Sequence, residues 1–185
     1  MAFREGKVIR RFRLRGKEVV FRYPRKGDLA NMVRHINSLV EERAYIAIQT
    51  KQTGAQQRKW LNDSLAGGTK GSRILVCVLV GGKYAGSSGI TRNKGDARRH
   101  VVTLGITLGK DFRNMGIGTE LLRTMESLAR REMKARVIQL SYFQDNERSK
   151  HVYEKLGYRE IGRVPKGVNH YGKYGDEVLM VKVLK

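Results

Sequence analysis

A strand-like run, a glycine-containing turn and an amphipathic helix follow one another from residue 100 to 130, and this unit constrains the fold most. The run HVVTLGITL is rich in β-branched and apolar residues, which predicts a central strand buried on both faces. After the turn, apolar residues recur at helical spacing, at Leu121, Leu122, Met125, Leu128 and Ala129. A helix with one apolar face is stable when that face packs on a sheet, so we expect helices layered on strands.

Strand and helix periods alternate through the rest of the chain. The clearest hairpin is RILVCVLV and KYAGSSGIT around Gly81-Gly82, because paired glycines tolerate the positive φ of a tight turn. Basic and apolar residues interleave from Phe12 to Arg22, which indicates a hairpin or edge strands. Two helices are expected next, one capped by Asp28 and reaching Val40, the other from Ala55 to Leu65.

The last third continues the alternation. The strand VIQLSYF precedes the helix ERSKHVYEKL, with Asp145 or Asn146 as its N-cap and Gly157 where a left-handed residue ends it. Two closing strands, YREIGRV and EVLMVKVL, follow. We therefore predict an α/β (α+β) fold and one domain over residues 1–185, in which residues 1–16 form a basic N-terminal extension or an edge hairpin.

The composition is strongly basic. With 38 Lys and Arg against 17 Asp and Glu, the net charge is +21, which favours an anionic partner such as a ribosome, RNA, an acidic protein or a polyphosphate. A well-solvated basic surface explains the same charge. The N-terminus lacks the apolar core of a signal peptide and no run is long enough to span a bilayer, so we expect a soluble, cytoplasmic protein.

The turn before the helix at residue 117 carries the most chemistry. Arg113-Asn114-Met115-Gly116-Ile117-Gly118 combines free helix-start amides, glycines that admit a close ligand and a fixed positive charge, which are the parts of a phosphate cradle. An ordinary turn with glycines chosen for packing has the same pattern. No G-K-[ST] or G-x-G-x-x-G spacing is present, which argues against nucleotide hydrolysis and hydride transfer.

A second segment makes the pattern specific. The sequence R-x-x-G-x-G followed by N-x-x-S-x-x-x-Y-E-K-L-G-Y resembles, in order and position, the two conserved segments of GNAT-superfamily N-acetyltransferases. PRKGDLANMVRHINSLVEER and GKYGDEVLM are similar to the opening and tail of that family, so the resemblance extends from about Val19 to the C-terminus. It implies an acetyl-CoA-dependent acyltransferase with a central mixed, mostly antiparallel sheet, helices on both faces, and a splayed strand pair that holds CoA.

The resemblance also implies site residues. The strands HVVTLGITL and VIQLSYF would diverge, and Ile106, Thr107 and Leu108 would pair with pantetheine. The pyrophosphate would rest on the amides from Arg113 to Thr119, that is Arg113, Asn114, Met115, Gly116, Ile117, Gly118 and Thr119. Asn146 and Ser149 share a helix face with Tyr153, which matches the family's general acid; a tyrosine packed between helix and sheet is the alternative.

The general base is left open. The family's glutamate on the central strand is matched here by Thr103, which cannot act as a base, and Glu41, Glu42 or His100 could act only through water. Cys77 lies mid-strand without an activating partner, so direct attack in a ternary complex is favoured over an acetyl-cysteine. Four scattered histidines and one cysteine offer no metal spacing, and we expect no metal.

Several acceptors and roles fit the sequence. A protein or peptide amine is favoured, and a polyamine-type small molecule is the alternative, although a net charge of +21 would repel a polycation. A basic RNA- or ribosome-associated binding protein, a catalytically silent CoA-binding relative and a homodimer are further hypotheses. A measurable affinity for CoA separates the acetyltransferase from the RNA- or ribosome-associated binding protein.

Overall fold

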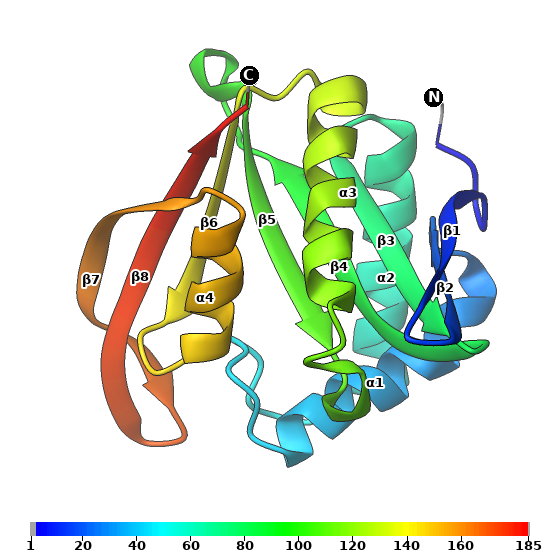
Figure 1. Ribbon diagram of the computed structural model, residues 1–185, viewed down its shortest axis with the longest axis horizontal. Coiled ribbons are helices and arrows are strands. Elements are labelled where there is room, and N and C mark those ends of the chain that lie inside the picture. Colours follow the sequence, from blue (N-terminus) through cyan, green and yellow to red (C-terminus); the bar gives the residue numbers. More distant parts are fainter. Residues whose placement is uncertain (1–2, 185) are drawn as a thin grey trace.

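The computed structural model describes residues 3–184, which form one eight-stranded sheet and the helices that cover it (Figure 1). The strand order is β1-β2-β3-β4-β5-β6-β8-β7. The strands are β1 (Val8–Leu14), β2 (Lys17–Arg22), β3 (Arg73–Val80), β4 (Lys83–Arg92), β5 (Val101–Leu108), β6 (Val137–Phe143), β7 (Arg159–His170) and β8 (Lys173–Val183). The α-helices are α1 (Leu29–Glu41), α2 (Gly54–Thr69), α3 (Ile117–Met133) and α4 (Glu147–Lys155).

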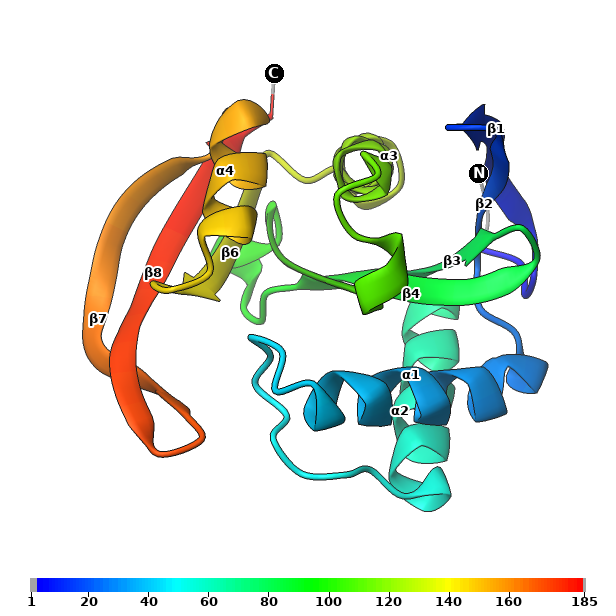
Figure 2. The ribbon, with the colours of Figure 1, turned by 60° about the horizontal axis from the view of Figure 1, so that its bottom comes forward.

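The helices lie on both faces of the sheet. Figure 2 shows α3 and α4 on one face and α1 and α2 on the other. Every neighbouring strand pair is antiparallel except β5 and β6, which are parallel. The mixed, mostly antiparallel sheet with helices on both faces is therefore confirmed, whereas a single domain over residues 1–185 stays a prediction.

The basic N-terminal segment pairs with the sheet. β1 and β2 form the expected hairpin, closed by Arg15 and Gly16, whose φ values of 49° and 75° fit a type I′ turn. Phe12 packs edge-to-face on Phe21, with ring centroids 5.3 Å apart. Within the described residues, Val8–Leu14 is thus an edge strand, while residues 1 and 2 of the expected extension lie outside them.

Two local expectations were wrong. β5 is not buried on both faces: Val102 and Leu104 are buried in the core, but Thr103 and Gly105 on the opposite face are exposed, because that face borders a cavity. Asp28 precedes α1 as expected but does not cap it; its carboxylate accepts two hydrogen bonds from buried Arg22, at 2.5 and 2.7 Å. Burial would raise the pKa of Asp28, but the hydrogen bonds from Arg22 and the Arg25 amide hold it below its ordinary value.

The closing strands are longer than the sequence indicates. β7 and β8 form a hairpin through the turn at Tyr171 and Gly172, and the pairing register shifts between Val164 and Val168. That irregularity accommodates Pro165, which has no N–H to donate, and β7 is the edge strand, where proline is tolerated. Because of this length, the hairpin reaches the loop after α1.

Candidate acetyl-CoA site and acceptor cavity

The parallel strands β5 and β6 separate to form a wedge. They pair only between Val101–Thr103 and Val137–Gln139, and both strands then continue without pairing to each other. Figures 1 and 2 show the two strands diverging, with α3 and α4 on either side of the gap. A cavity of about 1100 Å³ lies here, lined from one side by β5, the start of α3 and α4, and from the other by α1, α2 and the loop between them. The splayed pair expected from the sequence is present.

The turn before α3 has the geometry of an anion cradle. Asn114 and Gly116 both have positive φ, 57° and 85°, and the first backbone bond of the helix runs from the Glu120 amide to the Gly116 carbonyl at 3.2 Å. The amides of Ile117 to Thr119 precede that bond, so helix geometry leaves them without an acceptor within the helix. A Cβ on Gly118 would lie 3.6 Å from Leu108, an ordinary contact, so the packing of α3 on β5 does not itself require this glycine. These residues fit a bound pyrophosphate.

Most of the predicted coenzyme residues border the cavity. The ten that line it are Ile106, Thr107, Leu108, Arg113, Asn114, Gly116, Gly118, Thr119, Asn146 and Ser149. Met115 and Ile117 pack against or within the core, and for them the prediction concerned the backbone amides. Their roles in binding stay predictions.

Arg113 differs from the free charge that the sequence suggested. Its Nη2 donates to Oε1 of Glu42, and its Nε donates to the Leu108 carbonyl at 2.8 Å. Both side chains of the ion pair are only about 20% exposed, at 19% and 20%. The pair therefore joins α1 to the end of β5 and neutralises most of the charge that Arg113 would offer a phosphate.

The helix α4 presents Tyr153 to the cavity. Asn146 caps α4, since its side chain accepts from the Ser149 amide at 3.3 Å, which confirms its expected cap role. Tyr153 lines the cavity but is only 6% exposed, and its ring lies 6.0 Å from that of Tyr142. Burial raises the pKa of Tyr153 to about 12, although a hydrogen bond with Ser149 lowers it, so the hydroxyl keeps its proton at neutral pH.

Comparison with known proteins places this geometry in a family. Residues 18–159 match the acetyltransferase (GNAT) domain model. The chain belongs to the GNAT acetyltransferase family. The L-amino acid N-acetyltransferase AaaT of Escherichia coli is 27% identical over 111 residues, 60% of this chain and 67% of that protein.

Solved structures agree. A GNAT-family acetyltransferase from Streptococcus pneumoniae is 26% identical, with a TM-score of 0.80 over 90% of this chain and 99% of that one. The coenzyme A complex of RimL, a ribosomal L7/L12 α-N-protein acetyltransferase, has a TM-score of 0.82 over 96% of this chain and 98% of that one, at 15% identity, which shows the fold alone. The chain is accordingly an acetyl-CoA-dependent N-acetyltransferase of the GNAT family.

In this GNAT enzyme, the bases considered from the sequence are poorly placed. Glu41 is exposed and pairs with Lys51 at 2.8 Å, and His100 is exposed before β5; neither borders the cavity. Glu42 borders it but is paired with Arg113. Thr103 accepts a hydrogen bond from Gln139 at 3.0 Å and donates to Asn93 at 2.8 Å.

Glu177 is a cavity carboxylate that sequence reasoning missed. It lies on β8 beside Phe143, and Ser141 Oγ donates to its Oε1 at 2.6 Å. Among the described residues that line the cavity, Glu42 and Glu177 are the two carboxylates, and Glu42 is neutralised. The signal in the sequence was only an acidic residue within the apolar strand EVLMVKVL, which strand pairing alone brings next to Ser141.

His35 is the second missed residue. It lies on α1, its Nε2 is 3.0 Å from Thr107 Oγ1, and its ring packs edge-to-face on Tyr84 at 5.6 Å. Burial, with the nearby charge of Arg113, lowers the pKa of His35 to about 4, so the ring is neutral at pH 7. A helix contacting a strand 72 residues away leaves no local sequence signal.

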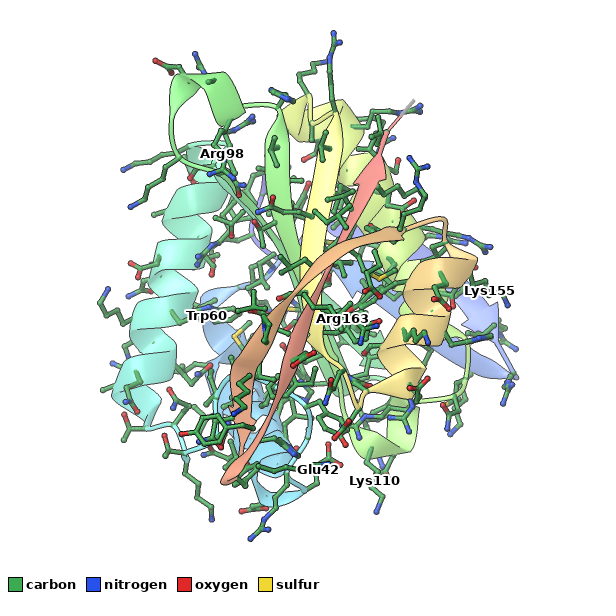
Figure 3. The ribbon with its side chains drawn as sticks, turned by 90° about the vertical axis from the view of Figure 1, so that its left-hand side faces the viewer. Glu42, Trp60, Arg98, Lys110, Lys155 and Arg163 are labelled. Atoms are coloured by element: carbon green, nitrogen blue, oxygen red, sulfur yellow. The ribbon has the colours of Figure 1, made fainter. Side chains whose placement is uncertain are left out.

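The loop after α1 and the end of the β7–β8 hairpin both line the cavity. The Tyr171 hydroxyl donates to the Val40 carbonyl at 3.0 Å, and Tyr45 stacks on His170 with ring centroids 4.6 Å apart. Figure 3 shows this end of the hairpin on the same side of the molecule as Glu42. The long hairpin therefore bounds the space that faces the wedge.

Within residues 3–184, no helix is long and apolar enough to cross a membrane. The same residues contain no cluster of three or more potential metal-binding His, Cys, Asp or Glu side chains. A cytoplasmic location and the absence of a metal stay predictions.

Proposed function

We propose that this GNAT enzyme acetylates an amine of a protein or peptide by direct attack in a ternary complex, with Tyr153 as general acid and Glu177 as proton acceptor. The observation that carries the proposal is the position of these two groups on opposite faces of β6. Tyr142 faces Tyr153, whereas its neighbours Ser141 and Phe143 face the side of Glu177. Residues alternate between the faces of a strand, so the phenol lies on one face of the sheet and the carboxylate on the other.

The coenzyme is held from one side of the wedge. Ile106, Thr107 and Leu108 would hold pantetheine, the amides from Arg113 to Thr119 would hold the pyrophosphate, and Asn146 and Ser149 would flank the thioester end. Bound there, acetyl-CoA supplies a thioester carbonyl open to an amine. The helix dipole of α3 favours the negative charge of the phosphates.

Two side chains of the protein, Glu177 and Tyr153, transfer the protons. Glu177 accepts a proton from the acceptor ammonium, while Ser141 holds Oε1 in place. The neutral amine then attacks the thioester carbon, the C–S bond breaks and Tyr153 donates its hydroxyl proton to the departing sulfur. The second proton lost by the nitrogen restores the phenol. A hydroxyl with a pKa of about 12 is protonated before the step and sits on the side of β6 that faces α4.

The lining of the cavity argues against a polyamine. Its charged side chains are two glutamates and four arginines: Glu42, Glu177, Arg43, Arg73, Arg113 and Arg148. A polycation needs a surplus of carboxylates, and the net charge of +21 repels it at longer range. The acceptor of AaaT, an L-amino acid, and that of RimL, a protein α-amine, are both compatible with this lining.

Turnover on a matched acceptor panel tests the proposal. The panel contains a peptide that begins with serine or alanine, the same peptide with a blocked N-terminus and one internal lysine, and spermidine. We expect kcat/KM to fall in that order, because an α-amine loses its proton near pH 8 and a lysine amine only above about pH 10. Acetylation of spermidine above both peptides, or of no amine despite coenzyme binding, would overturn it.

A further inference from the structure

The wall of the cavity between α2 and the sheet contains an arginine without a carboxylate partner. Arg73, the first residue of β3, is partly buried, donates from Nε to Thr91 Oγ1 at 3.2 Å and from Nη1 to Ser64 Oγ at 3.3 Å. Both partners are neutral hydroxyls. Among residues 3–184, no carboxylate oxygen lies within 4.0 Å of a nitrogen of the Arg73 side chain. A partly buried charge without a counter-ion is stabilised by an anionic ligand.

A second unpaired group lies on the same wall. Gln57 is only 7% exposed and lines the cavity, yet its side-chain amide has no hydrogen-bond partner among residues 3–184. Gln57, Trp60 and Ser64 follow one another at i, i+3 and i+7, so they share one face of α2. In Figure 3 Trp60 is drawn on the side of α2 that is turned toward the strands. The amide atoms of Gln57 are not fully enclosed, so they face open space in the cavity, where a polar ligand can hydrogen-bond to them.

The position of Arg73 relates this wall to the wedge. Arg73 pairs with Thr91, Thr91 pairs with Thr103, and Thr103 is the last β5 residue that pairs with β6. Two strand spacings place the Arg73 Cα about 10 Å from that of Thr103. An extended peptide covers this distance in about three residues.

We infer that Arg73, with Gln57 about two helical turns away on the same cavity wall, is an acceptor subsite for a carboxylate, supplied by an acidic side chain at the second or third residue of a peptide whose amine reaches the wedge. The inference rests on the proposed function, because that function places the amine of the peptide at the wedge. A free amino acid also offers a carboxylate. Its carboxylate is only one carbon away from its amine, so the molecule is too short to span the distance of about 10 Å from the wedge to Arg73. The overall positive charge brings acidic peptides to the enzyme.

Two pairs of acceptors test the subsite. The peptides Ser-Asp-Ala-Ala-amide and Ser-Asn-Ala-Ala-amide differ only in a carboxylate, as do leucine and leucinamide. For the wild type we expect kcat/KM to be about tenfold to hundredfold higher for the aspartyl peptide, the usual effect of a charge-assisted hydrogen bond. The substitution Arg73→Gln removes this preference, so that kcat/KM becomes the same for the two peptides, while Arg98→Gln, which removes an exposed charge outside the cavity, retains the preference.

Binding gives a readout that does not need turnover. Calorimetry of both peptides with CoA-loaded wild type and Arg73→Gln protein should show the same loss of preference. If the wild type acetylates neither peptide, the proposed function fails, and calorimetry still decides the subsite. Equal affinity of the wild type for both peptides, an equal loss for both in Arg73→Gln, or a preference for leucine over leucinamide that exceeds the peptide effect would overturn the inference.

Discussion

The hydroxyl of Ser141 donates to Oε1 of Glu177 over 2.6 Å, from a residue of β6 whose neighbour Tyr142 faces the opposite side of the sheet, toward Tyr153. The carboxylate, from β8, and the phenol, from α4, therefore lie next to neighbouring residues of β6 but on different faces of the sheet. In the proposed reaction, the proton taken from the incoming amine and the proton given to the departing sulfur would therefore move on different faces of the sheet.

Replacing Glu177 should slow acetyl transfer to the acceptor amine without changing the affinity for the coenzyme. Glu177→Gln keeps the size and the hydrogen bond from Ser141 but cannot accept a proton, so we expect kcat to fall about a hundredfold near pH 7. Activity should recover partly at higher pH, where more of the acceptor amine is already neutral. Steady-state rates across pH measure this, with Glu154→Gln, an exposed carboxylate of α4, as the control. An unchanged rate for Glu177→Gln would remove this residue from the mechanism.

The phenol of Tyr153 should matter for chemistry rather than affinity. We expect Tyr153→Phe to lower kcat by about a hundredfold or more, while the dissociation constant of CoA changes little. Tyr174→Phe, at a side chain that is 64% exposed, is the matched control. Because the pKa of Tyr153 is about 12, the wild-type rate should show no decline from loss of this proton below about pH 11. A descending limb near pH 9 that Tyr153→Phe abolishes would contradict the assignment of that pKa.

Cys77 should be dispensable for turnover. Its side chain is fully buried in β3, and burial, together with the nearby charge of Asp28, raises the pKa of its thiol to about 12, so a thiolate is scarce at neutral pH. Cys77→Ala is expected to keep full acetyl transfer and to lose about 1 kcal/mol of stability from the small cavity. Mass spectrometry of the wild type after acetyl-CoA treatment provides a second check, because a stable acetyl-cysteine would refute direct attack.

His35 should make the fold sensitive to acid. Its pKa is lowered from 6.5 to about 4 in the folded state, so the unfolded chain binds the proton first as the pH falls. Stability is fully present above pH 6.5 and is lost as the pH drops toward 4, by about 3 kcal/mol. The pKa of Asp28 is held below its ordinary value, so the stability that its carboxylate contributes is lost only at lower pH.

Urea unfolding of wild type and His35→Gln at several pH values measures this dependence. The variant should show a flatter profile between pH 6.5 and 4, whatever its stability at pH 7. Parallel profiles for the two proteins would show that His35 is not the group responsible.

Sequence patterns predicted the turns, helix ends and caps, which depend on residues that are close together in the chain. Gly81 and Gly82 close their hairpin with φ values of 55° and 76°, Gly157 ends α4 at 83°, and Asn146 caps that helix, each as its local signal indicates. Periodicity likewise located the strands and helices to within a few residues. The length of β7 is an exception, because Pro165 reads locally as a break but is tolerated at a sheet edge.

Side-chain partners across the fold could not be read in the same way. The charge of Arg113 was visible, but its neutralisation by Glu42, 71 residues away, depends on how α1 packs. Asp28 has the residue type of a helix cap, yet the buried Arg22 guanidinium takes its carboxylate. Glu177 and Arg73 become cavity residues only once eight strands are in order.

Titration of the folded protein with CoA by calorimetry tests the central claim, that the coenzyme phosphates rest on the first turn of α3. Thr119→Glu places a carboxylate there; the helix dipole favours that charge, so folding is not weakened, but the pyrophosphate is repelled. Ser127→Glu adds the same charge to α3 away from the cavity. We expect one CoA per wild-type chain, at least tenfold weaker binding by Thr119→Glu with no loss of Tm, and wild-type affinity for Ser127→Glu. Unaltered binding by Thr119→Glu, or no binding by well-folded wild type, would contradict the account.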